Sequence, residues 1–369
     1  MAISHAAQRW WTLAQAIMWC VGFALIVTLV LFPVIGLHAF WDVLIPVAPA
    51  VVALIPGIWR NVCPLGITSQ LPRRLGFSRL IHLNTTGQGW LSFAAVALLF
   101  LIIPLRHTTF DTNGLSTAIL LVAIGCLALI MGSILEGKSG WCAGLCPVHQ
   151  VEKLYGQHPT CTVDNPHCST CSKCVSACPD STPGVNPHTA ERSWPKRWAI
   201  LVFIGAFPGY IWGWFQTPDY LGTDGLANLM GTYLLPAAGG GATLALYVLL
   251  ISSMPMQRRR NIDRLFAAVA ISTYYWFRVP ALLGYGPFPG DGMLIDLTGS
   301  IPAPAFWAFR VVSTAFWVWW IAMRNNGLRP WMIRPPFEQP SGVLLTLSVS
   351  ATLNSGEPVR RQTPSCKPD

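Results

Sequence analysis

Eight long apolar stretches divide this chain of 369 residues and restrict it to a membrane fold. A helix needs roughly 20 predominantly apolar residues to cross a bilayer. Charged residues make up only 11% of the chain, whereas they are about a quarter of a soluble domain. We therefore expect an all-α polytopic membrane protein with about eight transmembrane helices. They would cover about residues 13–36, 43–58, 90–105, 115–135, 197–216, 229–253, 265–283 and 301–323.

Two of these stretches contain residues that interrupt helices. The second contains Pro46, Pro49 and Pro56, which predicts a kinked or partly re-entrant segment. The sixth contains Pro236 followed by three glycines at 239–241, which predicts a discontinuous helix. Seven spans are therefore the alternative count.

The basic residues indicate how the spans are oriented. If the chain alternates sides from its N-terminus, all but Arg106, Arg278 and Arg310 of the 24 Lys and Arg residues fall on one side or at its boundary. The positive-inside rule makes that side cytoplasmic. We expect a protein of the bacterial inner membrane with both termini cytoplasmic. Because the basic residues are spread over many loops, the net charge of +9 does not indicate nucleic-acid binding.

This topology divides the chain into four parts. Residues 1–135 form N-terminal membrane hairpins, and 136–196 form a cytoplasmic loop rich in cysteine. Residues 197–323 form a C-terminal membrane part, and 324–369 form a cytoplasmic tail rich in Pro and Arg. Apolar and polar residues alternate over 345–353, which predicts either a strand or a poorly ordered tail.

The cysteine loop has a spacing that is typical of iron–sulfur proteins. Cys168-x2-Cys171-x2-Cys174-x3-Cys178-Pro179 matches a bacterial ferredoxin cluster loop. A cytoplasmic location keeps thiols reduced, which favours metal binding over disulfides. The sequence therefore predicts a ferredoxin-like iron–sulfur loop.

The number of cysteines suggests two clusters. Cys20 and Cys126 lie in apolar spans and Cys366 in the tail, so we set these three of the eleven aside. Eight thiolates match two [4Fe–4S] clusters, with one cluster as the minimum. The eight candidate ligands are Cys63, Cys142, Cys146, Cys161, Cys168, Cys171, Cys174 and Cys178.

The division of these ligands between two clusters stays open. One cluster takes Cys168, Cys171 and Cys174 with either Cys63 or Cys146, and the other takes the remaining four. Alternatively, Cys63 is a free cysteine at the membrane surface, and Cys161 is likewise not a ligand.

An internal repeat links two of the hairpins. Residues 59–66 read W-R-N-V-C-P-L-G, and residues 141–148 read W-C-A-G-L-C-P-V. Each ends a span with a Cys-Pro pair, at Cys63 and Cys146. The first copy has Trp59 where the second has Cys142, so it supplies one thiolate. A Walker A pattern at 132–139 is rejected, because its first glycine lies in an apolar span and no strand precedes it.

The C-x3-C-P turn followed by a ferredoxin loop resembles the polyferredoxin-type membrane electron-transfer proteins over about residues 43–180. These include NapH- and MauN-like subunits of nitrate reduction and methylamine oxidation, the C-terminal part of the nitrous-oxide-reduction protein NosR, and FixG/CcoG-like oxidase-assembly proteins. Those proteins carry two complete C-x3-C-P turns and two ferredoxin loops, whereas this chain has one of each and a half-copy. The resemblance implies iron–sulfur electron transfer linked to quinol.

Two arginines inside spans are the remaining candidate site residues. Arg278 and Arg310 lie in successive spans, near Asp291 and Asp296 of the loop between them. Charged residues at such depth face the protein interior or a cavity. They form either a polar pocket for a quinone or another anionic ligand, or structural pairs with aspartates. No span interior contains a histidine, so we expect no haem.

These features favour an electron-transfer subunit, which exchanges electrons between the quinone pool or a cytoplasmic donor such as ferredoxin and a partner redox enzyme. No catalytic residues are predicted. The alternatives are a copper reductase that assists assembly of a membrane metalloenzyme, and a non-catalytic membrane scaffold. Membrane lipid and a partner redox subunit are the expected partners.

Overall fold

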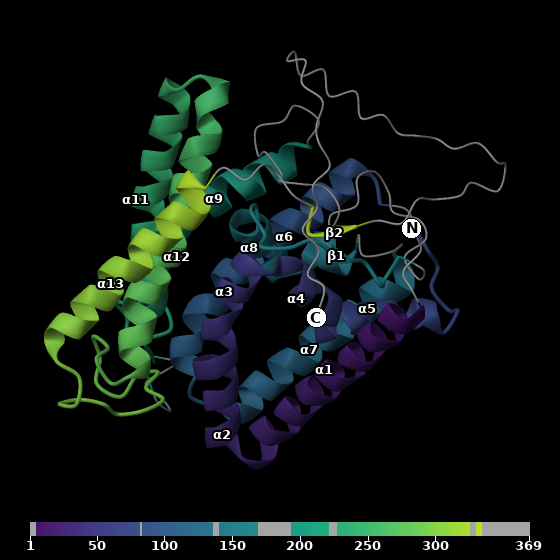
Figure 1. The fold of residues 1–369 in the computed structure, drawn as a ribbon, viewed down its shortest axis with the longest axis horizontal. Coiled ribbons are helices and arrows are strands. Elements are labelled where there is room, and N and C mark those ends of the chain that lie inside the picture. Colours follow the sequence, from purple (N-terminus) through teal and green to yellow (C-terminus); the bar gives the residue numbers. More distant parts are fainter. Residues whose placement is uncertain are drawn as a thin grey trace.

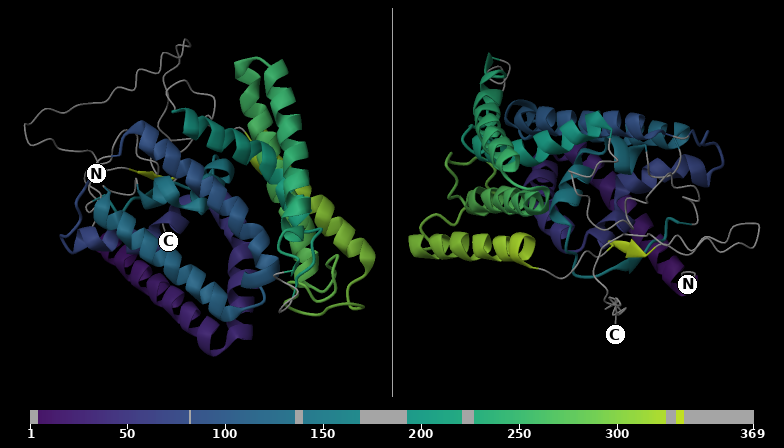
Figure 2. Two further views of the ribbon diagram at one scale, coloured as in Figure 1. Left: turned by 180° about the vertical axis from the view of Figure 1, so that it is seen from behind. Right: turned by 90° about the horizontal axis from the view of Figure 1, so that it is seen from above.

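The computed structural model describes residues 5–81, 83–135, 140–168, 193–220, 227–324 and 330–333. Helices dominate this part of the chain, as expected, and the only paired strands in it are two of two residues each. Figures 1 and 2 show the N-terminal helices as one group and the last three helices as another, with helix α9 between them.

The N-terminal group begins with a long helix and a hairpin of short helices. Proline occupies one of the first two positions of α2, α3, α4 and α5, where its missing N–H costs no hydrogen bond. The second apolar stretch is broken once, at Ile55 before Pro56, whereas Pro46 and Pro49 lie within one helical segment that ends at Leu54. The elements are α1 (His5–Leu31), α2 (Pro33–Leu37), the π-helical turn η1 (His38–Leu44), α3 (Ile45–Leu54), α4 (Pro56–Val62) and α5 (Pro64–Arg74).

A second hairpin follows. Its two long helices are each capped by an asparagine: Asn84 Oδ1 accepts a hydrogen bond from the Gly87 amide at 2.7 Å, and Asn113 Oδ1 accepts one from the Ser116 amide at 3.0 Å. The elements are α6 (Thr85–Leu105), the π-helical turns η2 (Arg106–Phe110) and η3 (Trp141–Leu145), α7 (Gly114–Ile134) and α8 (Pro147–Tyr155).

The C-terminal elements pack against this hairpin through α9. The strand β1 follows α8, and β2 follows the last helix; they pair in parallel, with Val163 opposite Met332 and Asp164 opposite Ile333. The elements are β1 (Val163–Asp164), α9 (Trp194–Trp214), α11 (Gly231–Ser253), α12 (Met256–Leu282), α13 (Ala303–Trp317), the π-helical turn η4 (Val318–Met323) and β2 (Met332–Ile333).

Seven helical segments of the described chain are long and apolar enough to cross a membrane. They correspond to seven of the eight expected spans in number and order, and the sixth is one continuous helix despite Pro236. The stretch at 197–216, which forms α9, is not among them. The seven segments are Ala6–Leu31, Pro33–Leu54, Thr85–Phe110, Gly114–Ile134, Gly231–Ser253, Arg258–Leu282 and Pro304–Met323.

Helix α9 occupies the interior, which explains its different composition. It runs alongside α6: Ser193 Oγ donates to the Thr85 carbonyl at 3.1 Å, and Trp214 Nε1 donates to the Ile103 carbonyl at 3.0 Å. Most of its residues are buried. A helix surrounded by protein does not need the uniformly apolar surface that lipid demands.

Glycines bring α9 and α11 into close contact. A Cβ on Gly209 would lie 2.0 Å from the Gly239 carbonyl oxygen, and one on Gly213 would lie 2.2 Å from that of Leu235. Only glycine permits this approach. The G-x3-G-x3-G pattern of α9 is therefore a helix-packing surface.

Candidate metal centre

The two Cys-Pro pairs form the same backbone turn. Cys63 has φ −57° and ψ 119°, and Cys146 has φ −64° and ψ 117°. Each cysteine precedes a proline-initiated helix, α5 or α8, and follows a short helical turn. The extended ψ is what a residue before proline prefers. The repeat that the sequence predicts is thus present in the backbone.

The thiols of the two turns lie at one end of the molecule. A Cβ on Gly66 would be 3.7 Å from both Cys142 Sγ and Cys63 Cβ, so only the width of one small residue separates the two cysteines. The Ser69 hydroxyl lies 3.9 Å from Cys142 Sγ. Cys142 is buried, and Cys63 and Cys146 are partly buried. Two hairpins about eighty residues apart in the chain therefore deliver three thiols to one region.

This environment disfavours thiolates unless a cation is present. Burial, with the neighbouring Cys142 thiol, raises the pKa of Cys63 to about 11, although the Gly66 amide acts in the opposite direction. Burial also raises the pKa of Cys146 well above the ordinary thiol value, and Glu152, Cys142 and Cys63 add to the effect. A metal must displace the thiol proton to bind. On their own, Cys63 and Cys146 are therefore held as neutral thiols, and a metal would have to displace their protons.

A buried ion pair joins the two turns. Arg60, three residues before Cys63, donates to the Glu152 carboxylate of α8, and its Nη1 lies 3.1 Å from His149 Nδ1. All three side chains are buried. Although burial would raise the pKa of Glu152, Arg60 and His149 hold it below the ordinary value. Burial lowers the pKa of His149 to about 4, so this imidazole is neutral at pH 7.

The remaining candidate cysteines are described only in part. Cys161 is buried and disulfide-bonded, so it would have to be reduced before it could bind iron. Cys168 is partly buried and follows Asn165 and His167 in a turn. Cys171, Cys174 and Cys178 lie outside the described residues. The ferredoxin-like trio therefore stays a prediction.

The segment after the last helix packs against this loop. Trp331 Nε1 donates to the Gly156 carbonyl at 2.6 Å, and the Trp331 ring stacks under Lys153 Nζ at 4.2 Å. Thr162 Oγ1 donates to the Pro330 carbonyl at 2.8 Å. Trp331 is buried, and its ring also lies beside Arg60. Residues 330–333 thus cover α8, which carries the second Cys-Pro turn.

Among the described residues, no three His, Cys, Asp or Glu side chains converge closely enough to hold a single metal ion. A four-iron cluster is larger than one ion and spreads its four thiolates around it. Cys63, Cys142 and Cys146 are thiols of the chemical kind that such clusters use. The predicted division places Cys63 and Cys146 in different clusters, each completed by other cysteines of the chain.

Arg278 and Arg310 do not meet. Arg278 forms a buried ion pair with Asp42 and donates to the Trp41 carbonyl at 2.7 Å. Arg310 lies between the rings of Trp276 and Trp307, 5.3 Å from each centroid. The expected neighbour Asp296 instead bonds to Thr298. The structural pairing that the sequence left open is therefore present at Arg278, with a different aspartate.

The cavity beside Arg278 is small. It measures about 30 Å³ and also touches His107, Asp219 and Asp291. A drug-sized ligand occupies a pocket of several hundred Å³, whereas one water needs only about 10–15 Å³. In this arrangement the cavity accommodates water and not a quinone ring.

Sequence reasoning missed two polar contacts at this same end. Arg106 makes a two-point salt bridge to Asp111 at 2.9 and 3.0 Å, and its guanidinium lies between the rings of Trp41 and Trp214. His107 Nδ1 lies 2.5 Å from Asp219 Oδ1. The only signal in the sequence was that Arg106 does not fall on the side that holds nearly all the other basic residues.

Comparisons with protein-family models, curated proteins and solved structures find no match for this chain.

Proposed function

We propose that the chain is a membrane electron-transfer subunit that holds iron–sulfur clusters at the end formed by the two Cys-Pro turns. The observation that carries this proposal is the convergence of Cys63, Cys142 and Cys146 from separate hairpins, on turns with matching backbone angles. Free structural cysteines do not require two such turns. Thiolate is also the usual protein ligand of these clusters.

The ligands would be the eight cysteines that the sequence selects. Cys63, Cys142 and Cys146 contribute from the membrane hairpins, and the loop contributes Cys161 once reduced, Cys168, Cys171, Cys174 and Cys178. A bound cluster accepts and releases single electrons. The protein buries Cys142, partly buries Cys63 and Cys146, and balances the nearby Glu152 charge with Arg60. The amide of Gly66, at the start of α5, favours a thiolate at Cys63.

The proposed orientation has eight crossings and a cytoplasmic cluster end. Support for an eighth crossing comes from α9, which has 21 residues and lies along α6 from Thr85 to Ile103. An even count places both chain ends with the basic loops, on the cytoplasmic side of a bacterial inner membrane. Alkaline phosphatase and green fluorescent protein fusions after residues 111, 220 and 324 test this. Phosphatase activity at 111 and 220, with fluorescence at 324, is expected.

Electrons would pass between a cytoplasmic donor or quinol and a partner redox enzyme. The test is anaerobic purification of the full chain, with iron and sulfide analysis, electron paramagnetic resonance and a redox titration. About eight irons per chain and a reversible signal are expected. A chain that binds iron but cannot be reduced reversibly would be a scaffold, and a chain without iron or sulfide would refute the proposal. Reduction by quinol analogues is then compared with reduction by ferredoxin and with copper reductase activity.

A further inference from the structure

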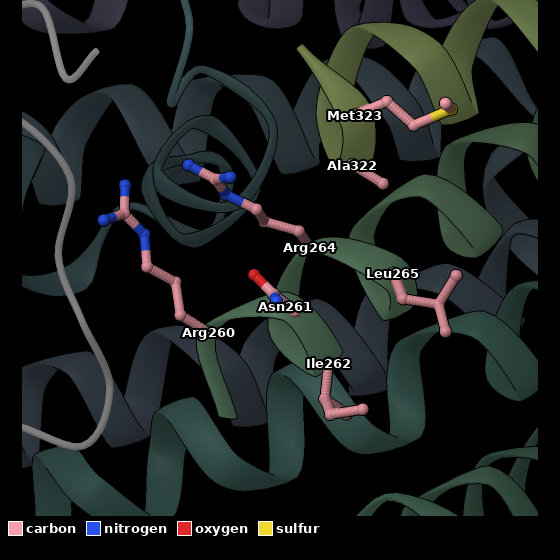
Figure 3. Close-up of a pocket in the computed structure, with 7 residues that line it drawn as sticks. All are labelled: Arg260, Asn261, Ile262, Arg264, Leu265, Ala322 and Met323. Atoms are coloured by element: carbon pink, nitrogen blue, oxygen red, sulfur yellow. The ribbon is translucent and has the colours of Figure 1, made fainter. Parts of the chain in front are cut away.

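A second concave site lies between the beginning of α12 and the end of η4. It is a cavity of about 660 Å³, lined by Arg260, Asn261, Ile262, Arg264, Leu265, Ala322 and Met323. Figure 3 shows these side chains around it. The segments Arg258–Leu282 and Pro304–Met323 could each cross a membrane, and the cavity lies where the first begins and the second ends. It is therefore at the boundary between bilayer and water.

This boundary belongs to the same end as the cysteine turns. Just beyond η4, the Arg324 guanidinium lies 3.5 Å from the His158 carbonyl, within the loop that follows α8. Trp320 Nε1 of η4 lies 3.4 Å from the Ala53 carbonyl, at the end of α3. The basic residues of α12 therefore face the side that the positive-inside rule assigns to the cytoplasm.

The lining is positively charged, and none of its described residues is acidic. Arg264 is only 8% exposed, yet its Nε has no hydrogen-bond partner in the described chain. The adjacent Asp263 accepts a hydrogen bond from the Tyr247 hydroxyl at 2.7 Å, and no ion pair between it and Arg264 is present in the described structure. In Figure 3, Arg260 and Arg264 extend to the same side of α12.

Such an arrangement is costly without an anion. The buried Nε of Arg264 has lost its hydration without gaining a hydrogen bond, and the second cation nearby, Arg260, adds repulsion. Guanidinium groups bind phosphate oxygens with paired, charge-assisted hydrogen bonds. Leu265 and Met323 expose apolar surface next to the two arginines, at 43% and 68% of their areas. The cavity thus combines a site for a phosphate with a surface for an acyl chain.

We propose that this cavity binds the headgroup phosphate of an anionic phospholipid from the cytoplasmic leaflet, held by Arg260 and Arg264. Basic pockets between transmembrane helices bind such headgroups. The site is separate from the cysteine turns and does not depend on their cluster.

The test uses the full chain with native mass spectrometry and detergent exchange. Phosphatidylglycerol and phosphatidylcholine are titrated separately into the wild type and into the variants R264Q, R260Q and R79Q. Arg79 is exposed and lies outside the cavity, so R79Q removes one positive charge without changing the lining. We expect phosphatidylglycerol to be retained at least about tenfold more than phosphatidylcholine. R264Q and R260Q should abolish that preference and R79Q should preserve it.

Two results would overturn the proposal. Equal retention of the two lipids by the wild type would show that no anionic headgroup is selected. Equal phosphatidylglycerol retention by R264Q, R260Q and wild type would place the lipid elsewhere. Inorganic phosphate is titrated in detergent as a separate arm; phosphate binding without lipid selectivity would assign the cavity to a soluble anion and refute the lipid. If R264Q does not fold, the lipid retention of R260Q decides the outcome, because Arg260 is partly exposed.

Discussion

Arg60 and Glu152 form an ion pair that is buried between the two Cys-Pro turns. Replacing Glu152 by Gln leaves the Arg60 charge uncompensated, which costs about 3 kcal/mol of unfolding free energy. Thermal unfolding in detergent at pH 7 measures this loss. Because the folded pKa of Glu152 lies below 4.5, the wild type loses the contribution of the pair only as the pH falls below 4.5 and through that folded pKa. The difference between E152Q and wild type should therefore shrink in acid; a constant difference would contradict this account.

Cys63 is expected to be a cluster ligand even though it lies far from the cysteine loop in sequence. The change Cys63→Ser should lower the iron content by about half, because one of two clusters loses a thiolate. Iron analysis and electron paramagnetic resonance after anaerobic purification measure the effect. Cys126→Ser is the matched control, since Cys126 is exposed on α7 and is not a candidate ligand. Full iron content in C63S would show that Cys63 is dispensable.

Gly132 allows α7 to pack closely against α5, at Ser69. A Cβ there would lie 1.7 Å from the Ser69 carbonyl oxygen, so Gly132→Ala forces α7 away from α5. Overpacking of this kind costs about 1–3 kcal/mol. Gly125→Ala on the same helix is the control, because no atom lies within 4 Å of its added Cβ. Thermal unfolding of both variants should show a lower midpoint for G132A alone.

Trp331 holds the segment after the last helix against α8. Truncation to Ala removes a buried indole and its hydrogen bond to the Gly156 carbonyl, which costs about 3–5 kcal/mol locally. Limited proteolysis should then cleave near Gly156 faster than in the wild type. Trp319→Ala serves as control, since Trp319 is about half exposed. Equal cleavage rates in W331A and wild type would show that the contact does not protect the loop.

Local patterns explain which parts of this structure were predictable. Seven spans follow from apolar runs, and the Cys-Pro turns follow from proline, which restricts the residue before it. The sequence predicts α9 as a span like the others, but it does not show that the neighbouring helices bury most of its residues.

The sequence selected the cysteines of the candidate site but not the residues around them. The Cys-Pro repeat pointed to Cys63, Cys142 and Cys146, which lie near one another in the structure. It could not pair Arg60 with Glu152, or Arg278 with Asp42, since each pair depends on the packing of distant helices. The predicted partners of Arg278 were its neighbours in sequence, and packing selected a residue on another hairpin instead.

The pairing of β1 with β2 also sets the order of events during synthesis. Residues 163–164 leave the ribosome long before 332–333, and the long helices α9, α11, α12 and α13 of the described chain lie between them. Until the last of these helices has been inserted, Trp331 cannot cover Gly156 and Lys153. Gly156 and Lys153 therefore stay uncovered by Trp331 throughout translation of the C-terminal half, and this contact closes only after the last helix has been made.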